Sequence, residues 1–248
     1  MKKPIVHLYA ISYNEEVLMP HFLKYYTGFC EKIFIYDNCS DDSTLEICKS
    51  YENVSIFSYE TNNQIRDDIY MKIKNEAWKK SRGLADFVIV CDIDEFIYSN
   101  SMTTYLEQAL AQGITLVKSI GYNMVSDVLP SKESNVFKDI PFGARSVNFD
   151  KTLIFNPNLI EEINYEFGAH SCCPTGTLKY SNERLFLLHF KYLSVSYIRD
   201  RYKKFNSRLS SFNKKRNLGY HYSFSNFRIS REFKSIQKKS VNVLDQIR

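Results

Sequence analysis

The chain has 248 residues, of which 44% are hydrophobic and 25% are charged, and its formal net charge is +5. These fractions are typical of a folded protein, and a chain of this length buries a core without needing disulfides or zinc. Only 8 glycines and 6 prolines are present, which excludes collagen-like and low-complexity classes. No apolar stretch reaches the roughly 18 residues of a membrane-spanning helix. The apolar run near the N-terminus is too short for a signal peptide, so we expect a cytoplasmic protein.

The first hundred residues alternate between short apolar strands and helices. Strands are predicted at residues 5–11, 32–36, 54–59 and 87–91. Helices are predicted at residues 14–27, 44–51 and 66–81. Pro20 either kinks the first helix or marks its true start. Strands this continuously apolar predict a mainly parallel sheet with helices on both faces.

The pattern changes after residue 100. A helix is predicted at 102–111 and a strand at 115–124. The long loop predicted at 126–150 is interpreted as a binding loop or lid. Short β-like pieces follow at 152–155, 163–167, 177–180 and 185–192, and C-terminal helices are predicted at 194–209 and 227–247.

The six cysteines contain no CxxC pair, which excludes zinc-finger and thioredoxin-like classes. Cys172 and Cys173 are adjacent, so an unusual redox or metal pair is one interpretation. Unpaired thiols in a reducing compartment are the favoured interpretation.

Acidic and amide side chains follow three of the predicted strands, as Asn14-Glu15-Glu16, Asp37-Asn38 and Asp92-Ile93-Asp94. The carboxyl ends of parallel strands lie at one edge of a sheet, where ligand sites form. Asp92 and Asp94 are two residues apart, so on an extended chain they point to one face and repel each other unless a cation lies between them. Carboxylate oxygens favour Mg²⁺ or Mn²⁺. The alternative is that these acids only cap the turn after the strand.

Five motifs are specific in combination: Ser12-Tyr13-Asn14-Glu15-Glu16, Tyr36-Asp37-Asn38-x-Ser40-x-Asp42, Asp92-Ile93-Asp94-Glu95-Phe96, Gly168-Ala169-His170 and Leu188-His189-Phe190-Lys191-Tyr192. Together they resemble the motifs of bacterial glycosyltransferases of the family 2-like type, which have a GT-A fold. The resemblance covers residues 4–200. It implies a Rossmann-like, mainly parallel sheet flanked by helices, with a mixed acceptor-side half. It also implies a metal-dependent enzyme that uses a nucleotide sugar.

The resemblance implies a donor site residue by residue. Asn14 and Glu15 would line the base end of the nucleotide-sugar pocket, and Asp37 would bind the ribose or the base. Arg66 and Asp67 would lie near the ribose or the diphosphate. The implied donor-binding residues are Ser12, Tyr13, Asn14, Glu15, Asp37, Asn38, Arg66, Asp67, Asp92 and Ile93.

The resemblance also implies a metal site for Mn²⁺ or Mg²⁺. Asp94 would bind the metal, and His189 would close the metal site. Asp92 would contact the ribose or sugar, or would join the metal. His189 interrupts an apolar strand, so a purely structural role is the alternative for it. No Gly-rich phosphate loop is present, and the resemblance implies that the metal carries the diphosphate instead.

An inverting transfer needs a base that deprotonates the acceptor hydroxyl. Asp127 is the first candidate, because the loop that holds it follows a predicted strand and would cover the acceptor. Glu166 and His170 are the alternatives, and each of the three has the alternative of being an ordinary loop residue. His170 is also a candidate for binding the metal, the diphosphate or the acceptor. Inversion at the anomeric carbon is implied by the resemblance alone.

The modest net charge is unevenly distributed. Residues 199–248 contain 14 Lys and Arg and 3 Asp and Glu, a charge of +11, whereas the remainder contains 19 basic and 25 acidic residues, a charge of −6. Aromatic residues alternate with the basic ones in the C-terminal segment. Three interpretations are packing onto the domain, peripheral contact with anionic lipid on the inner face of the plasma membrane, and nucleic-acid binding. Nucleic acid is the least favoured, because no known nucleic-acid module is present.

We therefore expect a GT-A domain at residues 1–198, with a nucleotide-sugar-binding half at 1–100 and an acceptor-side half at 101–198. The basic, aromatic helical segment at 199–248 follows. The expected function is transfer of a sugar from a nucleotide sugar, preferably a UDP-sugar, to a hydroxyl of a glycan or lipid-linked acceptor in bacterial surface polysaccharide or lipopolysaccharide synthesis. The alternatives are a catalytically silent nucleotide-sugar-binding or scaffold protein of this fold and, less favoured, a sugar nucleotidyltransferase.

Overall fold

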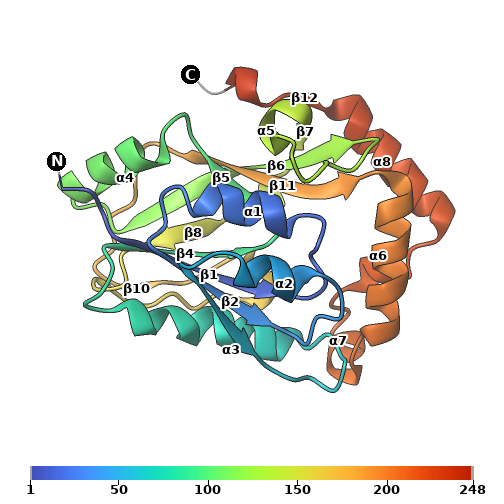
Figure 1. Ribbon diagram of the computed structural model, residues 1–248, viewed down its shortest axis with the longest axis horizontal. Coiled ribbons are helices and arrows are strands. Elements are labelled where there is room, and N and C mark those ends of the chain that lie inside the picture. The colour runs from blue at the N-terminus through green and yellow to red at the C-terminus, as the bar shows by residue number, and fades with distance from the viewer. Residues whose placement is uncertain (1, 247–248) are drawn as a thin grey trace.

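The computed structural model describes residues 2–246, in which a ten-stranded mixed sheet carries helices on both faces (Figure 1). The strands of this sheet are β1 (Val6–Ser12), β2 (Lys32–Asp37), β3 (Val54–Ser58), β4 (Phe87–Asp92), β5 (Glu95–Tyr98), β6 (Leu116–Ser126), β7 (Phe142–Arg145), β8 (Thr152–Phe155), β11 (Leu185–Leu193) and β12 (Val241–Asn242). A separate pair is formed by β9 (Ile160–Glu162) and β10 (Thr175–Gly176).

The α-helices are α1 (Met19–Tyr26), α2 (Thr44–Lys49), α3 (Asp67–Glu76), α4 (Met102–Ala111), α5 (Val136–Asp139), α6 (Val195–Arg208), α7 (Ser211–Lys215) and α8 (Asn226–Lys239). Short 3₁₀ helices are η1 (Ala77–Ser81), η2 (Val147–Phe149), η3 (Phe167–Ala169), η4 (Tyr220–Ser223) and η5 (Leu244–Gln246). The α/β class predicted from the sequence is confirmed.

Four parallel strands, in the spatial order β3-β2-β1-β4, form the N-terminal half of the sheet. All four begin and end within one residue of their predicted bounds. The register pairs Ser12 with Asp37 and Ile11 with Asp92. The ends of β1, β2 and β4 therefore lie at one edge of the sheet, as the apolar runs predicted.

The strand β1 is apolar on both sides because both faces of the sheet are covered. Leu8 and Ala10 belong to a core that includes side chains of α1 and α2. Tyr9 points to the opposite face and packs in a second core with Trp78 of η1. Successive strand residues alternate between the faces, so one continuous apolar run serves two cores.

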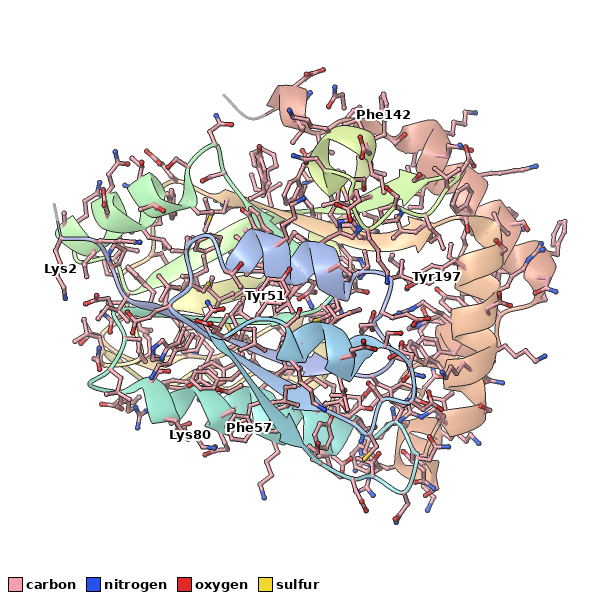
Figure 2. The ribbon with its side chains drawn as sticks, in the orientation of Figure 1. Lys2, Tyr51, Phe57, Lys80, Phe142 and Tyr197 are labelled. Carbon is pink, nitrogen blue, oxygen red and sulfur yellow. The ribbon has the colours of Figure 1, made fainter. Side chains whose placement is uncertain are left out.

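The outer strand of the parallel half, β3, is shielded by a lysine. Lys80 places its ammonium 5.0 Å from the centre of the Phe57 ring (Figure 2). The same ammonium lies 5.9 Å from the ring of Tyr36. A positive charge over these rings makes this edge of the sheet a poor partner for another strand.

The other half of the sheet is mixed. β8 lies antiparallel between β4 and β6, and β11 runs parallel to β6 and antiparallel to β5. The register places His189 of β11 opposite Asn123 of β6 on one side and Glu95 of β5 on the other. Three distant parts of the chain therefore meet at His189.

Helix α1 begins at Met19, five residues after the predicted start, and Pro20 lies in its first turn. Pro20 therefore marks the true start of the helix. Asn14 has a left-handed φ of 54°, its side-chain Nδ2 donates to the carboxylate of Asp41, and its Oδ1 accepts from the backbone amide of Asp41. A left-handed φ is not compatible with a right-handed helix, so the helix does not begin at Asn14.

The region predicted as a loop, residues 126–150, contains α5, β7 and η2. The strand predicted at 163–167 is wrong: Asn164 has a φ of 52°, and η3 begins at Phe167. The strand β5 was not predicted, because its apolar residues follow directly on the acidic run after β4. Short elements of this kind depend on their neighbours in the sheet more than on local pattern.

The C-terminal segment folds onto the sheet. Figure 1 shows α6 and α8 at one end of the molecule, where they pack on β6 through a core that includes Val125, Ile198, Tyr202, Ile229 and Phe233. The boundary predicted between residues 198 and 199 falls inside α6. The helix predicted at 194–209 is confirmed, whereas the helix predicted at 227–247 ends at Lys239, and its final predicted residue lies outside the described range.

Between residues 2 and 246, no helix has both the length and the apolarity that crossing a membrane requires. All six cysteines are free thiols, as expected.

Candidate active site

A cavity of about 360 Å³ opens at the carboxyl ends of β1 and β4. We call it the donor cavity, because several of the residues predicted to bind the donor line it. Its floor includes the turn after β4, one wall comes from α3 and η3, and the opposite wall comes from β11, α6 and η4. Tyr197 lies on the side of α6 that faces the sheet (Figure 2). Arg201, Tyr202 and Arg208 of α6 line the cavity, so the segment at 199–248 is part of the site.

The three acids after β4 have three different environments. Asp92 forms an ion pair with Lys74 of α3, with 2.6 Å between Oδ1 and Nζ. Glu95 is buried and pairs with Lys151, with 2.5 Å between Oε1 and Nζ. Within the described residues Asp94 has no lysine or arginine partner, and its only ion-pair neighbour is His189. Of these three acids, Asp94 is therefore the one whose charge no lysine or arginine neutralises within the described residues.

Asp94 and His189 face each other with 3.4 Å between Oδ2 and Nε2. His189 Nδ1 donates a hydrogen bond to Asn123 Oδ1 at 2.8 Å, which turns Nε2 toward Asp94. Burial opposes ionisation of Asp94, but the charge and hydrogen bond of His189 outweigh it and hold the pKa of this carboxyl well below its usual range. The pair therefore presents an ionised carboxylate and an oriented imidazole to the cavity.

This donor set fits a small divalent cation. A carboxylate oxygen and an imidazole nitrogen are both common ligands of Mn²⁺, and Asn123 holds the imidazole as an outer-shell partner does in metal sites. No group of three or more His, Cys, Asp or Glu side chains is placed to hold a metal in the described part of the chain. The protein would therefore supply two ligands, and substrate oxygens or water would supply the others.

Basic side chains form much of the opposite wall. Arg201 of α6 makes two hydrogen bonds to the carboxylate of Glu15, at 2.8 and 2.9 Å. Burial lowers the pKa of Arg201, but the carboxylate of Glu15 raises it by more, so this guanidinium stays charged. Arg208 lies 3.2 Å from the centre of the Tyr13 ring. Lys191 forms no ion pair within residues 2–246, and burial lowers its pKa.

His170 is a second histidine in the donor cavity. Its Nδ1 donates to the carbonyl oxygen of Asn148 at 2.8 Å, so Nε2 is the free acceptor nitrogen. Burial and the nearby ammonium of Lys151 lower the pKa of His170 and favour the neutral ring. Gly168 has a φ of 73°, and a Cβ there would come within 2.8 Å of the His170 ring. The glycine therefore allows the ring to sit where it does.

Nine of the residues predicted as site residues line the donor cavity: Ser12, Tyr13, Glu15, Asp67, Asp92, Ile93, Asp94, His170 and His189. They come from β1, the start of α3, the turn after β4, the end of η3 and β11. The predicted convergence at the strand ends is therefore observed. Burial raises the pKa of Asp67, which has no ion-pair partner among the described residues.

Three predicted donor residues at the loops after β1 and β2 do not line the cavity. Asp37 is fully buried, and its carboxylate accepts hydrogen bonds from the amide and hydroxyl of Ser40. Asn38 is buried and accepts a hydrogen bond from Arg208 at 2.8 Å. Asn14 bonds to Asp41 at the surface. These residues hold the loops together instead of facing the cavity.

Three further candidates also lie outside the cavity. Arg66 is turned to its neighbour Asp68, with 2.6 Å between Nη2 and Oδ2. Asp127 is exposed and accepts a hydrogen bond from Gln237 of α8 at 2.9 Å. Glu166 is exposed and accepts one from Ser171. Of the three predicted bases, only His170 lines the donor cavity.

The sequence pattern missed most of the cationic side chains of the site. They are Lys74, Lys151, Lys191, Arg201 and Arg208. Lys191 belongs to the motif at residues 188–192, in which only His189 was singled out. The two arginines belong to the basic C-terminal segment at residues 199–248, to which no role in the site was assigned. The remaining two lysines carried no local signal, because each acquires its role from an acid far away in the chain.

The model of glycosyltransferase family 92 matches residues 10–228. The prediction of a glycosyltransferase is confirmed by this match, and the family that matches is 92 rather than the family 2-like type that the motifs resembled. A comparison with curated protein sequences gives no match.

Among solved structures, the chain is similar to S. aureus TarS, with 13% identity and a TM-score of 0.43 over 80% of this chain and 40% of TarS. The chain thus spans less than half of that protein. TarS 1–349 in complex with UDP-GlcNAc gives 14% identity and a TM-score of 0.42, covering 82% of this chain and 66% of that one. The third structure is glucosyl-3-phosphoglycerate synthase from Mycobacterium tuberculosis, in complex with Mn²⁺, UDP and glucosyl-3-phosphoglycerate. Its sequence identity is 14% and its TM-score 0.33, over 48% of this chain and 44% of that one.

Proposed function

The chain belongs to glycosyltransferase family 92, and we propose that it transfers a sugar from a nucleotide sugar, preferably a UDP-sugar, to a hydroxyl of a glycan or lipid-linked acceptor, with inversion. One observation carries the proposal: the Asp94–His189 pair and the basic side chains Lys191, Arg201 and Arg208 line one cavity. The leaving group of such a transfer is a nucleoside diphosphate. Fixed positive charge in a site shielded from water stabilises that developing charge.

The donor diphosphate would lie between Asp94 and the cations Lys191 and Arg201. Within residues 2–246 Lys191 forms no ion pair, so it can bind an oxygen of the diphosphate without breaking one. Tyr13 offers a ring face, and Asp67 offers a carboxylate to a ribose hydroxyl or a base N–H. These groups orient the donor before reaction.

Asp94 and His189 would hold Mn²⁺ or Mg²⁺. When bound, the metal supplies Lewis-acid stabilisation of the departing diphosphate. Asp92 stays with Lys74 in this proposal, because breaking that pair would leave a buried ammonium uncompensated.

We assign the base to His170, with Nε2 as the atom that accepts the proton of the acceptor hydroxyl. Nδ1 is bonded to Asn148, which holds the ring in one tautomer. The lowered pKa keeps this nitrogen unprotonated at neutral pH. Asp127 and Glu166, the other candidates from the sequence, lie outside the cavity.

The acceptor pathway that fits the sequence resemblance is bacterial surface polysaccharide or lipopolysaccharide synthesis. A lipid-linked acceptor would bring the enzyme to an anionic membrane surface. Phe227 at the start of α8 is 76% exposed, and the basic Arg228 and Arg231 follow it. We propose peripheral contact through this end of α8, and flotation with anionic liposomes tests it: Phe227→Ala should reduce binding at low salt, and no binding by the unaltered protein would contradict it.

The main test combines binding with turnover. UDP-, GDP- and CDP-sugars are added with and without Mn²⁺, and the melting temperature and nucleotide release are measured. Stabilisation that depends on Mn²⁺ and is largest for one UDP-sugar is expected, because a ligand that binds only the native state stabilises it. Stabilisation without nucleotide release or transfer would favour the catalytically silent alternative. No stabilisation by any nucleotide sugar at millimolar concentration would contradict the proposal.

A further inference from the structure

A second cavity of about 330 Å³ adjoins the donor cavity. It lies between β6, η2 and β11 on one side and η4 and α8 on the other. The two cavities share four lining residues: Phe149, Lys191, Tyr202 and His221. A molecule in the second cavity would therefore border on the group that the donor cavity holds.

The second cavity is lined by aromatic rings. Tyr192, Tyr220 and Phe224 belong to it alone, and Phe149 and Tyr202 separate it from the donor cavity. Tyr220 is 53% exposed, and its ring packs against that of Phe224. Ring faces suit the flat C–H faces of a pyranose, and their hydroxyl groups suit its edges.

Polar groups stand between these rings. Glu232 of α8 has one ion-pair neighbour among the described residues, Arg228 at 3.6 Å, which is a long contact for such a pair. Lys191 lies at the junction of the two cavities and has no ion pair within residues 2–246. The side chains of Asn148 and Ser235 make no hydrogen bond in the part of the chain that the structure describes. Each of these groups is free to bond a hydroxyl.

The mixture of groups decides between a sugar and an acyl chain. A hydrocarbon chain in this space would leave the carboxylate of Glu232 and the ammonium of Lys191 buried without partners, which is costly. A carbohydrate offers donors and acceptors to both while its C–H faces meet the rings. The volume is at the lower end of the range for small-molecule sites, which suits one or two sugar rings.

We propose that the second cavity is the acceptor subsite and that it binds a pyranose ring, with a hydroxyl donated to Glu232 and another edge directed past Lys191 to the donor cavity. This inference rests on the proposed function and deepens it, because it names a carbohydrate as the acceptor group that enters. A lipid-linked acceptor would then enter by its sugar, with the lipid outside the cavity.

The experiment is saturation-transfer NMR on the full chain in the presence of UDP and Mn²⁺. The probes are the methyl glycosides of glucose, galactose, mannose and N-acetylglucosamine. At least one should show transfer to its ring protons while UDP is bound. Ser235→Trp, which fills the second cavity, should abolish that transfer, and Glu232→Gln should weaken binding about tenfold through loss of a charged hydrogen bond.

Lys234→Trp is the matched control, because Lys234 is exposed on α8 and does not line the cavity. It should leave both glycoside and UDP binding unchanged. UDP binding, followed by melting temperature, should be normal in all three variants, which separates this inference from the proposed function. No transfer to any of the four probes, displacement of the glycoside by UDP, or undiminished transfer in Ser235→Trp would each overturn the acceptor subsite.

Discussion

The N-terminal half of the sheet and the C-terminal segment line the same cavity with opposite chemistry. The strand ends bring Glu15, Asp92 and Asp94, whereas α6 brings Arg201 and Arg208. The sequence carries −6 in residues 1–198 and +11 in residues 199–248. The charges that looked like a body and a separate tail are therefore two walls of one site.

The two regions also reach their positions differently. The acids gather because parallel strands end at one edge, which follows from local pattern. Their repulsion is relieved from elsewhere in the chain: Lys74 pairs with Asp92, Lys151 with Glu95, and Arg201 with Glu15. Within the described residues Asp94 has no such lysine or arginine partner, which is why we propose it as the acid that binds the metal.

The largest effect is expected for Asp94→Asn. Removing the ionised carboxylate that faces His189 should lower nucleotide-sugar turnover on the order of 10³-fold, as the loss of a group that stabilises leaving-group charge does. Initial rates at saturating donor measure it. Asp200→Asn is the control, because Asp200 is exposed on α6 outside the cavity, and it should retain activity. Full activity in Asp94→Asn would contradict the proposal that the carboxylate of Asp94 is needed for transfer.

Among the changes considered, loss of the buried Glu95–Lys151 ion pair should lower the free energy of unfolding the most. Glu95→Ala leaves the ammonium of Lys151 buried and unpaired, so the free energy of unfolding should fall by about 3–5 kcal/mol. Urea denaturation measures it. Replacing both partners, Glu95→Leu with Lys151→Met, should recover much of the loss, since an apolar pair leaves no buried charge. A double variant less stable than Glu95→Ala would contradict the paired-charge account.

His170→Asn tests the proposed base. The transfer rate should fall about 10²-fold, within the usual range for general-base catalysis. Because the pKa of His170 is lowered, the ring stays neutral as the pH falls to 6.5, and the acidic limb of kcat/KM should lie below that pH. The limb should vanish in His170→Asn and persist in Glu166→Gln. An acidic limb unchanged by His170→Asn would assign the base to another group.

The ion pair that joins the two regions should be strongly coupled. In a double-mutant cycle with Glu15→Gln and Arg201→Met, the interaction energy in urea unfolding should be about 2 kcal/mol, because the contact has two hydrogen bonds and is shielded from water. The exposed pair Lys2–Asp86 is the control and should give less than about 1 kcal/mol. Equal coupling in both cycles would mean that α6 is not held to the strand end by this contact.

The smallest effect is expected for Asp127→Ala. This carboxylate lies outside the donor cavity and bonds to Gln237, so kcat should stay within about twofold of the unaltered protein, as is usual away from the chemistry. The measurement is the same transfer assay used for His170→Asn. A large loss here with little loss in His170→Asn would restore Asp127, the first candidate from the sequence, as the base.

Local pattern predicted the parallel half of the sheet well. Its strands are continuous apolar runs, and their ends carry the acids that were singled out. The donor-binding residues that the resemblance implied include Asp37 and Asn38, which do not line the cavity, because a polar residue after a strand can turn to the loop as easily as to the cavity. Burial and hydrogen bonding decide between these outcomes, and neither can be read from residue spacing.

The short elements after residue 100 were harder to predict. β5 has four residues and is held by pairing with β11, a partner about ninety residues further along the chain. Its strand character comes from that partner and not from its own run. The strand predicted at 163–167 failed for the converse reason, since Asn164 adopts a left-handed φ that no local pattern indicated.

The amino-acid sequence by itself determined the parallel sheet, the edge at which its acids meet and the uneven distribution of charge. These follow from periodicity over a few residues, which acts before any distant contact forms. Only the tertiary structure decided which acids are paired with a lysine or an arginine within the described residues and which helix lines the cavity. Glu15 and Arg201 are separated by 186 residues, so their pairing depends on how the whole chain packs. The distribution of charge can be read directly from the sequence. The partner of each charge cannot, because it depends on contacts between distant parts of the chain.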